Sequence, residues 1–154
     1  MIIDVALQIL ESQADGVFSM DLGITSNDLV TEDTLRTAVL ISIFSDARVS
    51  LEEMPDGEPT RRGFWGDALE ENDTFGSKLW LLAREKKTED VLDRAREYVT
   101  EALSWMVDDG IARELQIDTA WTPEGFLGIS GKVYRPNAET FQFDTAWNAE
   151  LGVA

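Results

Sequence analysis

The side chains of this chain that could perform catalysis are almost all carboxylates. They gather in three clusters, Glu70, Glu71 and Asp73, then Glu89 and Asp90, then Asp108 and Asp109. Paired carboxylates can hydrolyse glycosidic bonds, and clustered carboxylates can bind Ca²⁺ or Mg²⁺. With 30 acidic residues in the chain, however, adjacent pairs arise by chance, and two of the clusters lie where helix starts favour acids. We therefore expect no catalytic residue and no metal site.

The chain contains no histidine and no cysteine. Without histidine it lacks the usual general base near neutral pH and the nitrogen ligand of most zinc and iron sites. Without cysteine it can form neither a disulfide nor a thiolate nucleophile, which is compatible with a reducing cytosol. Its glycines match neither GxxxxGK[ST], which binds phosphates, nor GxGxxG, which binds dinucleotides. The composition favours a protein without enzymatic activity, and we expect no cofactor.

The formal net charge is −17. An excess of carboxylates repels phosphate groups, so we expect no nucleic-acid partner and no binding to anionic membranes. No apolar run approaches the ~18 residues that span a bilayer, and the N-terminus lacks the basic residues of a signal peptide. We expect the protein to stay where it is made.

The charges are unevenly distributed along the chain. Residues 1–35 contain seven acids and no lysine or arginine, whereas nine of the 13 basic residues lie between Arg61 and Arg113. This segregation predicts an acidic end and a mixed-charge middle that could contact complementary partners. A uniformly solvated acidic surface is the other explanation, and the sequence leaves both open.

Residues 1–154 are expected to form a single domain, because 44% hydrophobic content can fill one core at this length. We divide it into an N-terminal strand or arm over 1–27, a mainly helical core over 28–110 and antiparallel strands over 111–154. Ile2 to Leu10 alternates weakly between apolar and other residues, which indicates a strand or an extended arm.

Two shorter segments have helical patterns. Thr31 is a candidate N-cap for a helix over 32–44, and the apolar residues of that segment cover more than one side, which predicts burial on several sides. Asp73 or Thr74 could cap a second, short helix that contains Trp80.

The longest helix is expected to begin at Thr88 and to end at Gly110, a residue type that favours the left-handed conformation of a helix C-cap. After Gly110 the apolar residues no longer recur with the period of a helix but at every second position, as in a strand. This pattern predicts strands over 111–118, 126–135 and 140–147. Together these elements predict an α+β fold with two to three helices packed on an antiparallel meander.

Between residues 61 and 87 the sequence reads RRGFWGDALEENDTFGSKLWLLAREKK. Arginines near tryptophans are the composition that protein interfaces favour. Arginines could equally lock the core of the fold through bidentate bonds to carboxylates such as Asp67, Asp108 or Asp109. The candidate residues for these two roles are Arg61, Arg62, Trp65, Asp67, Trp80, Arg84 and Asp109.

Four strings, in this order, resemble a family of small tail proteins of Mu-like phages that belongs to the baseplate wedge. They are LRTAVLISIFSDARV, RRGFWGD, FGSKLWLLAREK and EYVTEALSWMVDDGIAREL. The resemblance covers about residues 28 to 120. The chain is also more distantly similar to the sheath-initiator wedge proteins of other contractile tails and related secretion injectors.

The resemblance implies a structural, non-enzymatic role in the tail baseplate of a virion assembled in the bacterial cytoplasm. The implied partners are larger wedge proteins, the tail hub and the sheath protein, which begins to polymerise on strands that the protein presents. About six copies would surround the hub. A monomeric state of the isolated chain is compatible with this role.

In the distant relatives a Glu-Pro-Arg segment after the long helix helps lock the core. The corresponding stretch here, residues 108–113, has no proline. The resemblance therefore carries over only Arg113 and Asp109, and Arg113 joins the candidate residues named above.

Two other functions remain as alternatives. A carboxylate-based, tail-associated hydrolase would need one acid with a raised pKa inside a cleft. An acidic binding module would hold a basic partner in a salt-dependent manner, although the many aromatic residues argue against a purely electrostatic decoy.

Overall fold

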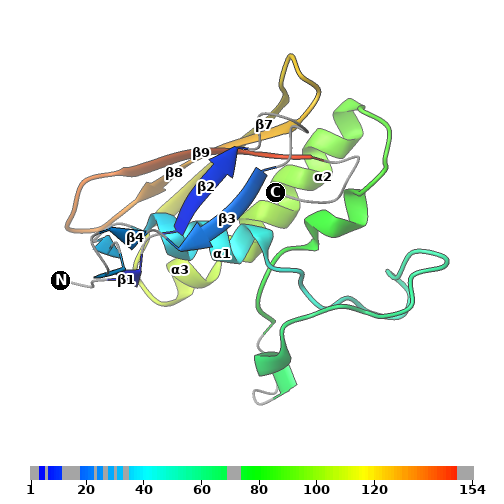
Figure 1. Cartoon of the computed structure of the whole chain (residues 1–154), viewed down its shortest axis with the longest axis horizontal. Coiled ribbons are helices and arrows are strands. Elements are labelled where there is room, and N and C mark those ends of the chain that lie inside the picture. The colour runs from blue at the N-terminus through cyan, green and yellow to red at the C-terminus, as the bar shows by residue number, and fades with distance from the viewer. Residues whose placement is uncertain are drawn as a thin grey trace.

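A three-stranded antiparallel sheet with helices on one face forms the larger part of the structure (Figure 1). The computed structural model describes residues 35–68 and 74–148, with side chains over 35–67 and 74–148, and the backbone of six short strands between residues 4 and 32. This architecture confirms the expected α+β fold class. Within the described residues, no helix is both long enough and apolar enough to cross a lipid bilayer.

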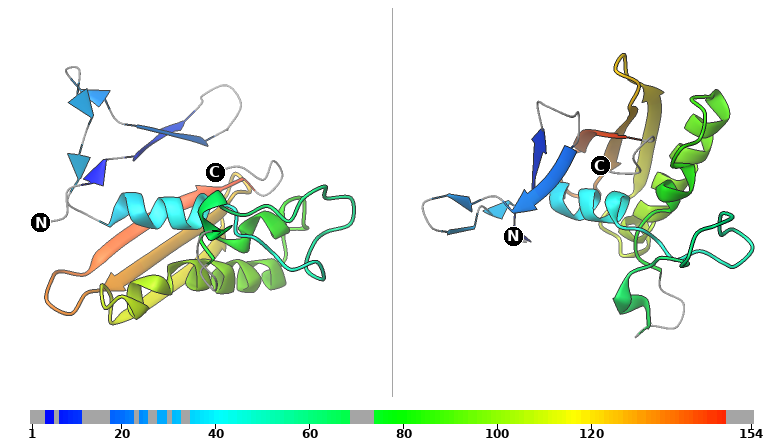
Figure 2. Two further views of the ribbon diagram at one scale, coloured as in Figure 1. Left: turned by 90° about the horizontal axis from the view of Figure 1, so that it is seen from below. Right: turned by 45° about the vertical axis from the view of Figure 1, so that its right-hand side comes forward.

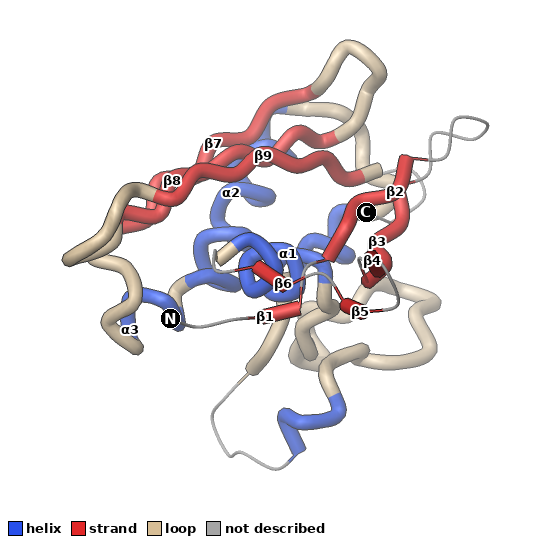
Figure 3. The backbone as a smooth tube through the Cα atoms, turned by 60° about the vertical axis from the view of Figure 1, so that its left-hand side comes forward, coloured by secondary structure: helices blue, strands red, loops and turns tan. Residues whose placement is uncertain are grey.

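The sheet consists of β7 (Glu114–Trp121), β8 (Leu127–Tyr134) and β9 (Phe141–Trp147), in that order. Alternate side chains face the helices, which lie on the same side of the sheet (Figure 3). The second and third predicted strands are confirmed. The first begins later than predicted because the amide of Ala112 still donates to the carbonyl of Met106 and closes the preceding helix.

Helix α2 (Glu89–Leu103) begins as predicted, because the Thr88 hydroxyl accepts a hydrogen bond from the amide of Val91 at 3.4 Å. The prediction of one continuous helix to Gly110 is wrong. Ser104 interrupts the helix, and α3 (Trp105–Asp108) follows as a separate short turn. Gly110 has a φ of 72° and ends this segment in the left-handed conformation that was expected.

Helix α1 (Arg36–Phe44) starts four residues later than predicted, with no side-chain cap. Thr31 is not its N-cap, because β6 (Thr31–Glu32) pairs with β1 (Asp4–Val5) instead. The expected burial on several sides is confirmed, since the buried residues are Thr37, Val39, Leu40, Ser42 and Ile43.

The segment between α1 and α2 holds only two short 3₁₀ helices among its described residues, η1 (Trp65–Ala68) and η2 (Lys78–Leu82). The predicted short helix is therefore the 3₁₀ turn η2. Its cap is Ser77, whose hydroxyl accepts from the amide of Leu79 at 3.1 Å. Thr74 lies too far from the first turn to cap it, and Asp73 lies outside the described residues.

The N-terminal strands pair with one another as β1 with β6, β2 (Leu7–Glu11) with β3 (Phe18–Leu22), and β4 (Ile24–Thr25) with β5 (Asp28–Leu29). The strand expected near the N-terminus is thus present as part of a hairpin. The side chains whose alternation suggested it lie outside the described residues. In both views of Figure 2, α1 lies between these strands and α2.

The core lies between the sheet and the helices. Its buried side chains come from all of these elements and are Val39, Ile43, Leu79, Leu82, Val91, Ala95, Val99, Leu103, Met106, Ala112, Ile117, Leu127, Ile129, Val133, Phe143 and Trp147. Polar contacts also join these elements: the Thr119 hydroxyl donates to the carbonyl of Leu92 at 2.8 Å, and Trp105 Nε1 donates to the Ser42 hydroxyl at 3.1 Å. These bonds fix α2 and α3 against β7 and α1.

Replacing Thr88 with alanine should lower the free energy of unfolding by about 1 kcal/mol, because the first turn of α2 loses its side-chain acceptor. Thr100→Ala is the matched control. The Thr100 hydroxyl donates to the carbonyl of Arg96 within the same helix, and alanine favours a helix at least as well. Urea denaturation of both variants would measure the difference, and equal stabilities would contradict the capping role of Thr88.

Candidate functional site

Arg62 and Trp80 form the centre of the arginine- and tryptophan-rich stretch. The guanidinium carbon of Arg62 lies 4.4 Å from the centroid of the Trp80 ring. Arg62 Nη1 donates to Asp46 at 2.8 Å, and its Nε donates to Glu58 at 3.3 Å. Trp80 is 4% exposed, and its Nε1 donates to the carbonyl of Ala47 at 3.0 Å. One cation–π contact and these polar bonds therefore join the loop after α1 to η2.

The backbone of Arg62 has a φ of 52°, in the left-handed region that non-glycine residues rarely adopt. Partial burial of Arg62 disfavours its charge, but the hydrogen bonds and charges of Asp46 and Glu58 outweigh burial and raise its pKa above the ordinary value. The guanidinium therefore stays charged while it holds the loop.

Arg61 and Ser77 close the base of the same loop. Arg61 Nε donates to the carbonyl of Val49 at 2.6 Å, and the amide of Val49 donates to the carbonyl of Arg61 at 3.2 Å. On the other side, the Ser77 amide donates to Ser45 at 2.8 Å, and the Ala47 amide donates to Ser77 at 3.0 Å. Both ends of the loop are thus fixed by backbone hydrogen bonds.

The exposed Phe64 and Trp65 and the half-buried Phe75 form an aromatic surface, which we call the aromatic ledge. The Phe64 ring lies 5.1 Å from that of Trp65 and 5.3 Å from that of Phe75. Trp65 is 76% exposed. Asp67 Oδ1 accepts from the amide of Phe75 at 3.1 Å and holds the ledge together, whereas its buried Oδ2 has no hydrogen-bond partner within the described part of the chain. Gly63, which precedes the ledge in sequence, has a φ of 107° and packs against Arg48. A side chain at position 63 would collide with Arg48.

Arg84 lies at the edge of a hollow of about 790 Å³, which we call the Arg84 hollow. Its lining consists of residues 55–58, Arg62, residues 80–81, residues 83–86 and Thr88. Arg84 is exposed, and its φ of 66° is again left-handed.

Six of the eight candidate residues lie in the segment between α1 and α2, where Arg62 and Trp80 are in contact, whereas Asp109 and Arg113 lie at the opposite end of α2. The 15 residues of that helix correspond to about 22 Å. Both side chains are exposed. Their backbones are ordered, since the amide of Asp109 donates to Trp105 at 2.9 Å and that of Arg113 to Tyr134 at 2.7 Å.

The acidic clusters do not converge in the described residues. Glu89 and Asp90 are exposed in the first turn of α2, and Asp108 and Asp109 are exposed after α3. Glu70, Glu71 and Asp73 lie outside the described residues. Nowhere in 35–67 or 74–148 do three acidic side chains come together in a way that could hold a metal ion.

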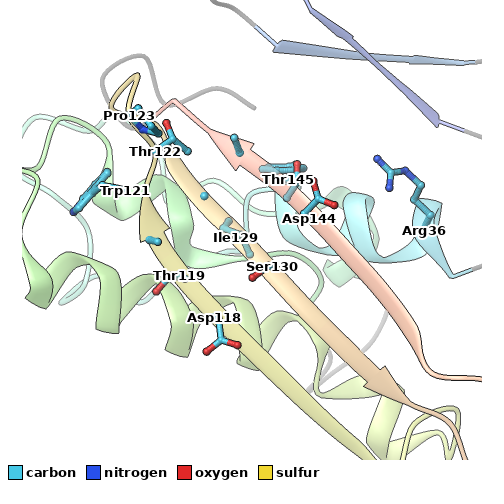
Figure 4. Close-up of a pocket in the computed structure, with 14 residues that line it drawn as sticks. Arg36, Asp118, Thr119, Trp121, Thr122, Pro123, Ile129, Ser130, Asp144 and Thr145 are labelled. Atoms are coloured by element: carbon cyan, nitrogen blue, oxygen red, sulfur yellow. The ribbon is translucent and has the colours of Figure 1, made fainter.

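A second hollow, of about 640 Å³, is lined by residues of all three strands and by Arg36 and Phe44 of α1 (Figure 4). Its floor includes Ala120, Gly128 and Ala146, which lie in one row across the three strands. In the next row on the same face, Asp118 of β7 and Asp144 of β9 lie on either side of Ser130 of β8. Two strand spacings amount to about 10 Å, so these carboxylates are too far apart to share a proton.

Sequence reasoning missed the carboxylates that organise the site. Asp46 binds Arg62 across 16 residues of chain, which no local pattern indicates. Glu58 is four residues before Arg62, a spacing that could have been noticed. Lys78 Nζ donates to Glu53 at 2.9 Å. No local pattern could have indicated this pair, because the two residues are 25 positions apart in sequence.

Trp80→Ala should lower the free energy of unfolding by about 3–5 kcal/mol, because the substitution empties a buried site and removes the surface on which Arg62 rests. Trp65→Ala is the matched control and should change stability by less than about 0.5 kcal/mol, because that ring is exposed. Chemical denaturation of the isolated chain would test both values. Equal losses for the two variants would show that Trp80 has no special structural role.

The lowered pKa of Glu53 predicts that the stability of the fold depends on pH. The bonds that Glu53 accepts from Lys78 and from the amide of Ser50 lower its pKa from 4.5 to about 2. The stabilisation is therefore complete above pH 4.5 and disappears as the pH falls towards 2. Because the Glu53 side chain is 41% exposed, we expect the effect to be at most about 1 kcal/mol.

The measurement compares unfolding of the wild type and of Glu53→Gln between pH 7 and pH 2. The variant should be less stable at pH 7, and the two curves should converge in acid. Glu97→Gln, whose side chain forms no ion pair with the described residues, is the control. A gap between wild type and Glu53→Gln that persists at the acid end would contradict the assignment.

The segment between α1 and α2 lies within the part of the chain that is similar to known proteins. A family model for "Phage protein GP46" matches residues 35–140. Baseplate protein gp46 of Escherichia phage Mu is 38% identical over 124 residues, which are 79% of this chain and 85% of that protein. Mu-like prophage FluMu protein gp46 of Haemophilus influenzae is 36% identical over 130 residues, which are 83% of this chain and 90% of that protein. These matches confirm the resemblance to tail proteins of Mu-like phages, and the chain belongs to the phage protein GP46 family.

Proposed function

We propose that this chain is a non-enzymatic structural component of a contractile phage tail baseplate, where it belongs to the wedge and initiates the sheath. The observation that carries the proposal is the similarity to a phage Mu protein named as a baseplate protein, which extends over 85% of that protein. The location is then the tail baseplate of the virion, after assembly in the bacterial cytoplasm, and the chain contacts other baseplate components.

The aromatic ledge is the contact surface for a larger wedge protein. Trp65 exposes most of its ring although Asp67 and Phe75 hold the surrounding backbone in place. A pre-ordered, exposed tryptophan loses little conformational entropy on binding and buries a large apolar area, which is typical of interface hot spots.

The edges of the sheet support the role in sheath initiation. Within the described residues, β7 and β9 each pair with β8 alone, so each has one side without a neighbouring strand. An open edge carries unpaired amide and carbonyl groups, and a strand from the sheath protein could add to it. Contacts with the tail hub and a ring of about six copies complete the proposed arrangement.

A phage from which this gene is deleted tests the proposal. We expect tails without an extended sheath and a loss of infectious particles, restored by the wild-type gene supplied in trans. Trp65→Ala should restore assembly poorly. Leu51→Ala should restore it fully, because Leu51 is equally exposed at 71% but lies outside the ledge.

Electron microscopy of the particles and co-purification with neighbouring tail proteins would provide the readouts. Normal, contractile and infectious tails without the gene would refute the structural role. Co-purification with a wedge protein but normal sheath assembly in the deletion would leave a wedge role and remove sheath initiation.

A further inference from the structure

Small side chains form the floor of the second hollow. Ala120, Gly128 and Ala146 make one row across β7, β8 and β9. Side chains alternate between the two faces of a sheet, so this row lies on the face opposite to the buried Leu127 and Ile129. Because no side chain of the row is larger than a methyl group, a trough runs across the three strands, which we call the sheet trough.

One wall of the sheet trough is apolar. Thr122 and Pro123 lie between β7 and β8 and line the hollow (Figure 4). The Thr122 hydroxyl accepts a hydrogen bond from the amide of Phe126 at 3.1 Å, and the Thr122 methyl group lies 3.4 Å from where a Cβ atom on Gly128 would be. The hydroxyl is thus engaged within the turn, and the methyl group borders the floor.

The opposite wall is acidic. Asp118 and Asp144 are the two ends of the next row, about 7 Å from the floor row. Asp118 accepts a bond of 3.4 Å from the uncharged Gln116, and Asp144 has no hydrogen bond or ion pair within the described residues. Lys132 lies in the row beyond and Arg36 lines the hollow, yet in the described structure neither forms an ion pair with these carboxylates. The acidic wall can therefore accept cations from another molecule, and the net charge of −17 attracts a basic partner.

The spacing of the carboxylates favours a peptide over a metal ion. Side chains stand roughly perpendicular to a sheet, so the carboxylates of Asp118 and Asp144 stay about as far apart as their backbones, at about 10 Å. Calcium binds its ligands at about 2.3–2.6 Å and would contact one of the two. Two cationic side chains on one chain can each reach a different carboxylate.

We propose that the sheet trough binds an extended segment of a neighbouring baseplate protein in which basic and apolar residues alternate. The two walls face each other across the floor, as the two sides of an extended chain do. Lysine or arginine side chains on one side then reach Asp118 and Asp144, because their aliphatic stems can cross one row of the sheet. The apolar side chains on the other side pack on Thr122 and Pro123. This inference rests on the proposed function, because it specifies the chemistry of one partner contact.

Variants of the full-length chain test the inference by calorimetric titration with the baseplate protein that co-purifies with the wild type. Asp118→Asn and Asp144→Asn each remove one charge at constant shape and should lower the affinity about fivefold, the effect of one exposed ion pair. Ala120→Phe fills the trough at constant charge and should also weaken binding. Asp108→Asn, an exposed acid outside the hollow, is the matched control and should bind normally. All four positions are exposed, so the melting temperatures should stay at the wild-type value.

The outcomes are distinct. Unchanged affinity of Asp118→Asn and Asp144→Asn, or an equal loss for Asp108→Asn, would overturn the inference and leave the proposed function intact. Normal binding by a stable Ala120→Phe would overturn it as well, and if that variant is unstable the Asp118 and Asp144 variants decide. A wild-type chain that binds no baseplate protein would contradict both the inference and the proposed function. Self-association of the wild type that the Asp118 and Asp144 variants abolish would overturn the inference and assign the trough to a second copy of the chain.

Discussion

The contact between the Arg62 guanidinium and the Trp80 ring is the interaction on which the shape of the segment between α1 and α2 depends. The segment between α1 and α2 has little regular structure in its described residues, so its shape depends on side chains rather than on a helix or a sheet ladder. Trp80 is buried and bonded to Ala47, and the charged group that covers it also binds Asp46 and Glu58.

The remainder of the fold was predictable where the determining forces are local. Thr88 and Gly110 mark their helix boundaries by side-chain capping and by a left-handed φ, and the strands after residue 113 follow from a period of two. Thr31 has the same local signal as Thr88, yet pairing with the first residues of the chain prevails over it. Such long-range pairing is invisible in a window of neighbouring residues.

The candidate site was predictable in composition but not in geometry. Arginines and tryptophans between residues 61 and 87 indicated a cross-link or an interface, and the structure contains both kinds of environment. Trp80 is buried beneath the partly buried Arg62, whereas Trp65 is exposed, although all three occur in similar sequence surroundings. The difference arises from the hydrogen bond of Arg62 to Asp46 and from the backbone bridge between Asp46 and Ser77. Both join residues that are far apart in sequence.

The hydrogen bonds of Ser77 to residues 45 and 47 bring the two ends of the intervening loop side by side. Lengthening a loop whose ends are already joined costs little, about 0.6 kcal/mol for each doubling of its length. The residues that form the outer part of this loop can therefore change in number and type while α1, η2 and the sheet keep their packing. The surface formed by this outer part can diversify separately from the stability of the core.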